Sequence, residues 1–468
     1  MEHRFSWLWV ETRVAAALAE WNLCAAKHSG DFPRFSQAEQ KLREHEYDRA
    51  LSLVEAEAKR LRRSPQERSA AQQRIMAVFP RFASVALGLE DDAVHMLTDS
   101  FLPIGTQFAH WAKRFDPELT MGDTIQACRN AWTVCGIQPL VGDRMQLTPA
   151  IIGYSLLYPY SDNYLDDERI STSRKLAFSR RFRDRLCGLR VEPENRHEST
   201  VWAMVRLIEE QYPRYRYPRV YECLLAIHQA QEDSLAQTRR RRSPDPTPDL
   251  LRLSFAKGGT SVLADACLCH GSLDEAQARF AFNWGVLLQL GDDLQDVQED
   301  LTNGAATLFS QAARNGIALD SLVRQLLAFS ERVADEAERL PDGGPALKRL
   351  LRGSWRSLIL MAVARSYRFF SPASLAELEP LSPFRFGFQR KRHKQLAGRR
   401  GLYQVLFEAF LASDVVLPDL PCPEEWLQYA METGRERNAG FGRAPWQQDR
   451  DDSDGIPVRY PATQGAAE

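Results

Sequence analysis

Apolar residues recur at three- and four-residue spacing along nearly the whole chain, and alternating β-branched runs are few. Residues three and four positions apart share one face of an α-helix, so this spacing predicts helices rather than strands. A chain of 468 residues is also long enough to bury a large core. The sequence therefore predicts an all-α protein. No apolar run approaches the ~20 residues of a membrane-spanning helix, and no transmembrane span is expected.

The character of the helical pattern changes along the chain and indicates four parts. Charge-rich helices, broken at Ser64-Pro65, come first, and a more apolar composition begins at Phe79. The last stretch is polar, lacks helical periodicity and has the composition of a disordered tail. The expected parts are a charged helical region at 1–78, the main domain at 79–375, a helical extension at 376–433 and the tail at 434–468.

Composition excludes some classes of function. The 60 basic and 62 acidic side chains give a net charge of −2, so bulk electrostatics indicates no nucleic-acid partner. The eight cysteines are dispersed and form no Cys-x-x-Cys pair, which is typical of reduced thiols in a reducing compartment. The first residues lack the basic and then apolar pattern of a signal peptide. We expect a cytoplasmic protein, and peripheral contact with a membrane stays open.

The stretch LLQLGDDLQDVQED, Leu287 to Asp300, places five acidic side chains directly after an apolar run. On one helix, Asp292 and Asp296 share a face. Asp293 lies beside Asp296, and Gln289 is one turn earlier. Two like charges ~6 Å apart repel by about 3 kcal/mol at an effective dielectric of ~20. This second acidic cluster therefore needs cations, protons or bulk water.

The first acidic cluster follows the apolar, aromatic stretch PAIIGYSLLYPY. Asp162 and Asp166 are four residues apart on one face. Asn163 and Asp167 form the adjacent ridge. Packing of the two buried helices can bring their acidic ends together across a cavity. Neither cluster contains a histidine, which argues against a di-iron site and for Mg²⁺ with phosphate oxygens. A single acidic cluster is also explained as a solvated helix end.

Basic side chains near the clusters are candidates for binding a diphosphate. Arg169, Arg180 and Arg181 follow the first cluster, and Lys257 precedes the second. The two glycines after Lys257 allow two interpretations: they weaken a helix and free its backbone groups, or they mark a helix end. Late in the chain, the Arg365–Arg368 segment has the charge to close over a diphosphate, with a solvated helix face as the alternative.

Other side chains near the clusters have a cavity interpretation and a packing interpretation. Arg129 and Asn130, on an otherwise apolar helix, are expected in the cavity, with an internal ion pair as the alternative. Nearby aromatic residues either stabilise positive charge by cation–π contact or serve as core packing. These aromatic residues are Tyr154, Tyr158, Tyr160, Tyr164, Phe280, Phe282 and Trp284.

The residues Gln289–Val297 resemble the second aspartate-rich motif, Q-x-x-D-D-x-x-D, of trans-polyprenyl diphosphate synthases. The segment that begins at Lys257 is similar to the K-T-A/G-x-L segment that precedes this motif in those enzymes. The first cluster departs from their D-D-x-x-D pattern, because Asn163 stands where a second aspartate is expected. Its Asp162–Asp167 string is closer to the D-x-x-x-D-D of squalene and phytoene synthase-like enzymes, and Tyr164–Asp167 resembles the Y-L-D-N of large-terpene synthases.

The resemblance covers residues 80–370 and implies the class I isoprenoid synthase fold, an all-α bundle around a central apolar cavity. It implies an enzyme that ionises an allylic prenyl diphosphate with the help of bound Mg²⁺. The family binds three such ions, and Mn²⁺ can replace them. Prenyl transfer or terpene cyclisation would follow. A homodimer is compatible with this family, and the alternative function is a non-catalytic prenyl-diphosphate-binding or partner subunit. The implied catalytic and metal-binding residues are Asp162, Asp166, Asp167, Asp292, Asp293 and Asp296. The implied diphosphate-binding residues are Lys257, Arg169, Arg180, Arg181 and Gln289.

Overall fold

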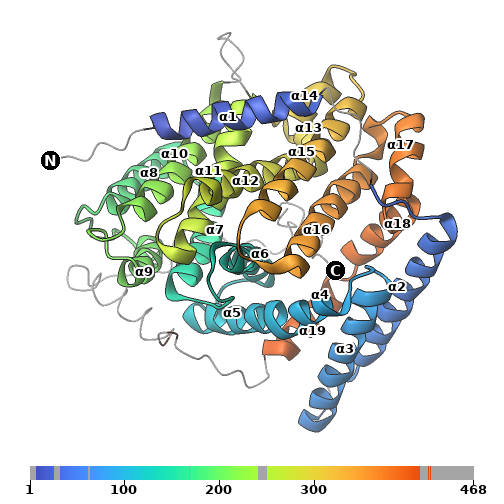
Figure 1. Ribbon diagram of the computed structural model, residues 1–468. Helices are drawn as coiled ribbons and strands as arrows, with labels where there is room; N and C mark the ends of the chain where they lie inside the picture. The colour runs from blue at the N-terminus through green and yellow to red at the C-terminus, as the bar shows by residue number, and fades with distance from the viewer. Residues whose placement is uncertain are drawn as a thin grey trace.

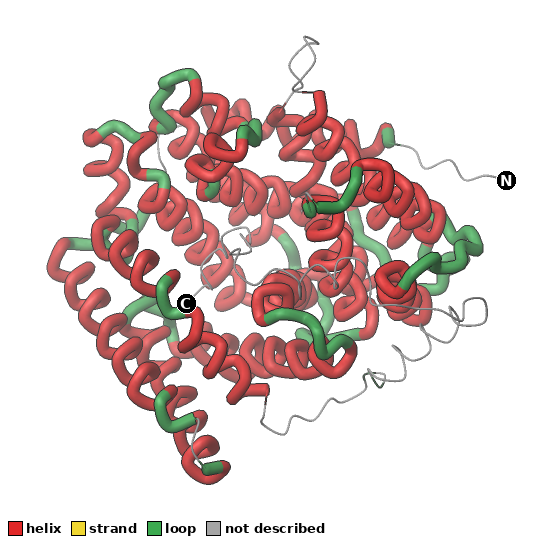
Figure 2. The backbone as a smooth tube through the Cα atoms, turned by 180° about the vertical axis from the view of Figure 1, so that it is seen from behind, coloured by secondary structure: helices red, strands yellow, loops and turns green. Residues whose placement is uncertain are grey.

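The computed structural model describes residues 7–25, 32–61, 64–167, 169–240 and 250–411, with Leu420 and Cys422. Within these ranges the backbone forms helices and connecting loops and contains no strand (Figure 2). The all-α prediction is therefore confirmed for this part of the chain. None of its helices is long and apolar enough to cross a membrane.

Long helices form a bundle at the centre of the molecule (Figure 1). They are α1 (Leu8–Ala25), α5 (Leu102–Phe115), α6 (Met121–Ile137), α7 (Pro149–Asp166), α9 (Arg196–Gln211), α10 (Pro218–Arg240), α11 (Leu250–His270), α12 (Glu275–Gln295), α15 (Asp320–Arg339) and α16 (Gly344–Arg365). α11 packs along α12, α10, α6 and α1, and α7 packs along α9 and α6. Their buried apolar side chains merge into one core, so these helices support one another as a single unit.

Shorter helices connect and cover the long ones. They are α4 (Asp91–Met96), a π-helical turn η1 (Leu97–Phe101), η2 (Gln138–Val141), α8 (Thr172–Leu186), α13 (Val297–Asn303), α14 (Leu308–Arg314), η3 (Tyr367–Phe369), α17 (Pro372–Leu378) and η4 (Glu379–Leu381). α8 lies against α10 and α9, and α13 lies between α12 and α14.

Two helices, α2 (Gln37–Ala58) and α3 (Pro65–Val85), form a hairpin that projects from the bundle (Figure 1). The predicted break between them is confirmed. The Ser64 side chain accepts a hydrogen bond from the backbone N–H of Glu67, and the Glu67 carboxylate accepts one from the backbone N–H of Ser64. This capping box starts α3 at Pro65. α19 (Arg400–Leu411) packs on the hairpin, and α18 (Phe386–Ala397) packs on α16.

The boundaries expected between domains do not coincide with the ends of helices. The division after residue 78 falls inside α3, and the division after residue 375 falls inside α17. α1, expected in a separate N-terminal region, packs on α11 and α15 instead. It does so because Val10, Val14 and Trp21 make one buried apolar face. The expected tail at 434–468 and the end of the expected extension lie outside the described residues.

Gly258 and Gly259 serve helix packing, so both interpretations of the glycines after Lys257 are wrong. α11 continues through them without a break. A Cβ atom on Gly258 would lie 2.4 Å from the carbonyl oxygen of Gly285 in α12, and one on Gly285 would lie 2.0 Å from the carbonyl oxygen of Gly258. Only residues without a side chain allow two backbones to approach this closely.

Candidate active site at one end of the bundle

The two acidic clusters lie at the same end of the bundle. Ser254, near the start of α11, donates a hydrogen bond to Asp293 at the end of α12. Gln231, in the second half of α10, donates to Asp162 near the end of α7. Nine residues separate the end of α10 from the start of α11, so both hydrogen bonds lie toward the end of the bundle where these two helices are joined.

Asp293 joins two helices in the second cluster. It is buried, and both of its carboxylate oxygens accept hydrogen bonds: Gln289 Nε2 donates to Oδ1 at 2.9 Å, and Ser254 Oγ donates to Oδ2 at 2.8 Å. Burial raises the pKa of Asp293 to about 7, although the two hydrogen bonds lower it. Gln289, expected to bind a diphosphate, is thus engaged with a carboxylate that ties α12 to α11.

The second cluster is divided between two helices rather than carried on one. α12 ends at Gln295, and Asp296, with φ −97° and ψ 10°, connects it to α13. Arg365, at the end of α16, lies beside this bend. Burial lowers the pKa of Arg365, while the charges of Asp296, Glu299 and Asp292 raise it. Arg365 therefore faces the second cluster and is not on a solvated helix face.

Lys257 lies on the same side of α11 as the contact with Asp293. It is half-buried and follows Ser254 by three residues, which places the two on one face of the helix. A Cβ atom on the adjacent Gly258 would lie 2.5 Å from Cβ of Gln289, so Lys257 is level with the last turns of α12. Lys257, which precedes the second acidic cluster in the sequence, thus also lies close to it in space.

The first cluster faces two directions. Asp162 is buried and turns toward Gln231 of α10. Asn163, on the adjacent ridge, donates to Asp123 of α6 at 3.3 Å. Asn163 therefore links α7 to α6, a role for which an amide hydrogen is needed. The side chain of Asp166 lies outside what the structure describes.

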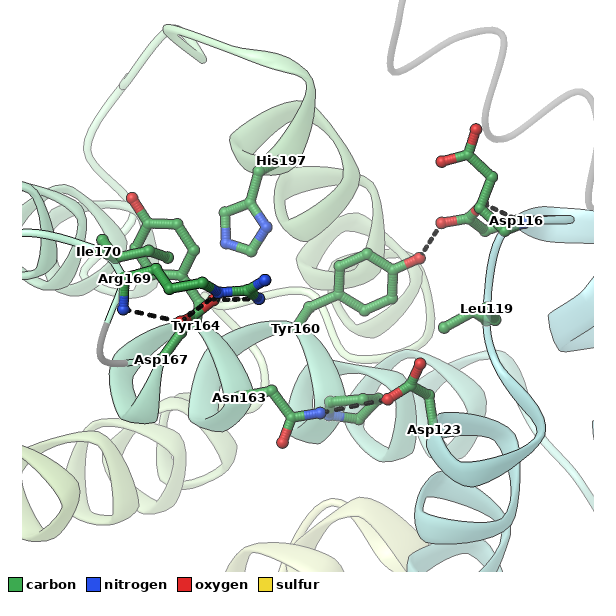
Figure 3. A pocket seen from close by; sticks show the side chains of 12 residues that line it. Asp116, Leu119, Asp123, Tyr160, Asn163, Tyr164, Asp167, Arg169, Ile170 and His197 are labelled. Atoms are coloured by element: carbon green, nitrogen blue, oxygen red, sulfur yellow. Dashed lines mark hydrogen bonds and ion pairs between the residues drawn. The ribbon is translucent and has the colours of Figure 1, made fainter. Parts of the chain in front are cut away.

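Asp167 and Arg169 form an ion pair just after α7, with 2.8 Å between Oδ2 and Nη2. The hydrogen bond from Arg169 lowers the pKa of Asp167. Both residues line a pocket of about 90 Å³, called the outer pocket, between α7, α9 and the loop before α6 (Figure 3). Asp167 thus lies apart from Asp162, because the chain leaves the helix at Asp167, with φ −64° and ψ 111°.

The outer pocket brings two residues that the sequence did not single out, Asp116 and His197, next to two of the aromatic candidates. Tyr160 donates a hydrogen bond to Asp116 in the loop between α5 and α6, and Tyr164 stacks on His197 with ring centroids 4.4 Å apart (Figure 3). Burial lowers the pKa of His197 to about 3. Asp116 and His197 carry no spacing signal, since each comes from an isolated position in a different part of the chain.

A smaller cavity of about 30 Å³ lies on the inner side of α7. Asn130, Tyr154 and Gln231 line it together with apolar side chains of α8 and α10, among them Phe182. It has room for about two waters. This pocket alone is too small for a prenyl chain, which could enter it only if the lining side chains moved aside.

Two of the expected diphosphate-binding arginines have other positions. Arg181 forms ion pairs with Glu198 at 2.8 Å and Glu194 at 3.0 Å, which anchor α8 to the start of α9. Arg180 is exposed, and its Nε donates to the carbonyl oxygen of Leu176 at 3.3 Å. Sequence proximity alone suggested these arginines, and the partners they have in the structure belong to neither acidic cluster.

The aromatic residues before the second cluster are core packing. Phe280 and Trp284 contact Trp355 of α16, with Trp284 and Trp355 ring centroids 5.2 Å apart. The ring of Phe282 covers Gly259. Among the aromatic candidates whose side chains are described, Tyr154 is the one that lines the inner cavity.

No three histidine, cysteine, aspartate or glutamate side chains converge as a metal-binding group within the part of the chain that the structure describes. Comparison of the chain with protein families, curated proteins and solved structures gives no match. The metal site and the family therefore stay predictions. The observed arrangement is two acidic helix ends, with Lys257 and Arg365 beside the second.

Asp265, deep in α11, makes stability depend on pH. Its carboxylate accepts hydrogen bonds from the Asn130 amide at 3.1 and 3.2 Å. Burial raises the pKa of Asp265 well above its usual value, and the hydrogen bond from Asn130 lowers it in part. The folded chain therefore binds this proton more tightly than the unfolded chain does. The free energy of unfolding should fall as the pH rises above the unfolded pKa of ~3.9.

An Asp265→Asn variant should remove this dependence. We expect its free energy of unfolding, relative to that of the wild type, to rise by about 1.4 kcal/mol per pH unit above pH ~4 until the raised pKa is passed. Urea denaturation of both proteins between pH 4 and pH 8 measures the difference. A difference that stays constant with pH would contradict the assigned shift.

Proposed function

We propose that the chain is a Mg²⁺-dependent class I isoprenoid synthase that ionises an allylic prenyl diphosphate. The observation that carries the proposal is the position of the two acidic clusters, from distant parts of the sequence, at one end of an all-α bundle. Prenyl transfer and terpene cyclisation are both compatible next steps.

The residues fit a hydrated magnesium ion better than a closed metal site. Mg²⁺ is commonly held by one or two carboxylates together with waters and substrate phosphate oxygens. Asp292 and Asp296 offer such oxygens at the second cluster, and Asp162 with Asp166 would offer them at the first. When bound, the ion would supply Lewis-acid stabilisation of the leaving diphosphate.

The protein's own groups would bind and orient the substrate. Lys257 and Arg365 would hold diphosphate oxygens beside the second cluster, since both lie next to its carboxylates. Asp293 would keep α11 and α12 in register through its two hydrogen bonds. The apolar side chains around Tyr154 would exclude water from the carbocation.

A non-catalytic protein that binds prenyl diphosphates is the second candidate. Two observations favour it: Asn163 is used to link α7 to α6, and Asp167 is paired with Arg169, so the first cluster has fewer available carboxylates than the family pattern.

Incubation with a panel of prenyl diphosphates, with and without Mg²⁺, separates the two functions. The enzyme releases diphosphate only when Mg²⁺ is present, and its products are identified by mass spectrometry. Tight binding of a prenyl diphosphate without release, at every chain length, would favour the second function. Neither binding nor release would reject both.

An Arg365→Gln variant tests the diphosphate-binding role. We expect KM for the prenyl diphosphate to rise by about 10- to 100-fold, because a charge-assisted hydrogen bond contributes about 1.5–3 kcal/mol. Steady-state diphosphate release measures it. Arg349→Gln, on the exposed first half of the same helix α16, is the matched control and should leave KM unchanged. An unchanged KM in both variants would exclude Arg365 from the substrate site.

A further inference from the structure

Basic side chains gather around Tyr367, where η3 follows α16. Arg368 Nε donates a hydrogen bond to the Tyr367 hydroxyl at 3.3 Å. The guanidinium carbon of Arg390, from α18, lies 4.2 Å from the centroid of the Tyr367 ring. The hydrogen bond from Arg368 lowers the pKa of Tyr367, and the charges of Arg368, Arg390 and Lys394 lower it further. These four residues are called the Tyr367 cluster.

Helix α18 has two basic faces with different partners. On one side, Arg385, the residue before α18, forms an ion pair with Glu44, and Arg392 of α18 forms one with Asp48, both partners being on α2. These pairs attach α18 to the projecting hairpin. The charges on this face are neutralised by the protein itself.

The other face of α18 carries Arg390 and Lys394, four residues apart and therefore one turn from each other. Within the described chain, neither of them nor Arg368 forms an ion pair with a carboxylate. Like charges held close together repel one another, and the π face of Tyr367 offsets only part of that repulsion. Three basic side chains thus surround one tyrosine, and this arrangement suits an anion.

The Tyr367 cluster adjoins the second acidic cluster. Arg365 precedes Arg368 by one turn of chain and lies beside Asp292, Asp296 and Glu299. From α18, His393 is near enough to Arg365 for that charge, together with burial, to lower the pKa of His393. The Ser366 hydroxyl donates to the carbonyl oxygen of Leu294 at 2.9 Å, which fixes the end of α16 on the end of α12.

We propose that Arg368, Arg390 and Lys394 form a binding site for a phosphate or diphosphate group that needs no metal ion. Guanidinium groups bind phosphate oxygens in pairs, and an ammonium group adds a mobile point charge. The ligand is a small phosphorylated molecule, either free inorganic diphosphate or the head of a prenyl diphosphate. The site does not depend on the proposed function, since it uses neither acidic cluster.

Calorimetric titration of the full chain with inorganic diphosphate, in buffer with a chelator and no divalent cation, tests this site. We expect saturable binding that Arg390→Gln and Lys394→Gln each weaken by about tenfold, because each removes one charge-assisted contact. Lys391→Gln is the matched control, since it removes the same charge from an exposed neighbouring position of α18 and should leave the affinity unchanged.

Three outcomes would overturn the proposal. The first is that the wild type shows no saturable binding. The second is an equal loss of affinity in the Lys391→Gln variant, which would indicate diffuse electrostatic attraction. The third is loss of binding in the Asp292→Asn variant, which would place the anion at the second acidic cluster. A titration with a prenyl diphosphate distinguishes the two ligands. If the site binds the head of a prenyl diphosphate, the affinity for that molecule is at least as high as the affinity for free diphosphate. Metal-free binding without any Mg²⁺-dependent release would reject the proposed function and keep this site.

Discussion

An Asp292→Asn variant is expected to stay folded and to lose Mg²⁺-dependent diphosphate release by about a thousandfold, or about 4 kcal/mol of transition-state stabilisation. Asp292 is half-buried at the end of α12 and lies near Arg365. The amide has the shape of the carboxylate but no charge, so it cannot neutralise a divalent ion. Asp296 and Glu299 would still lie near Arg365 in the variant, so the fold should be retained.

Diphosphate release with saturating prenyl diphosphate and Mg²⁺ measures the effect, and far-UV circular dichroism checks the fold. Glu275→Gln is the matched control: it lies at the opposite end of α12, is exposed and pairs with Arg13. It should leave turnover unchanged. Asp166→Asn is expected to have the same effect as Asp292→Asn. Full activity in both aspartate variants would reject the assignment of metal ligands.

The local features of the fold were predictable from the sequence. Helix positions follow from apolar residues at helical spacing, and the start of α3 follows from Ser64, Pro65 and Glu67, which act within four residues of one another. The location of the acidic clusters at helix ends was predictable for the same reason. The bend at Asp296 was not, because it occurs inside an uninterrupted helical pattern.

The direction of individual side chains was not predictable, because it depends on packing between helices. Arg181 was expected at the diphosphate on sequence proximity, but its partners Glu198 and Glu194 come from another helix and its preceding loop. Arg365 was an uncertain candidate from sequence, and its place beside the second cluster follows from the crossing of α16 over α12. Asn163 looked like a lost ligand, but it is a link to Asp123.

The role of Gly258, Gly259 and Gly285 was likewise not predictable from the sequence, because it depends on packing between helices. From sequence, a glycine pair in a helix indicates a weak point, because glycine loses more backbone freedom than alanine on folding. A partner helix reverses that conclusion, since the missing side chains allow α11 and α12 to touch. The approach of α11 to α12 sets where Ser254 meets Asp293, so the glycines position the second acidic cluster.

Gly285→Ala is therefore expected to destabilise the protein by about 3 kcal/mol, the upper range for overpacking. The added Cβ would lie 2.0 Å from the carbonyl oxygen of Gly258 and 3.1 Å from Cα of Gly259, and these backbone atoms cannot rotate away as a side chain does. The midpoint of urea denaturation measures the loss.

Gly353→Ala is the matched control, because it lies within α16 with no atom within 4 Å of the new Cβ. There, alanine should stabilise the helix by about 0.5–1 kcal/mol. Equal midpoints for Gly285→Ala and the wild type would mean that α11 and α12 do not meet at these glycines, and the position of Asp293 would then need another explanation.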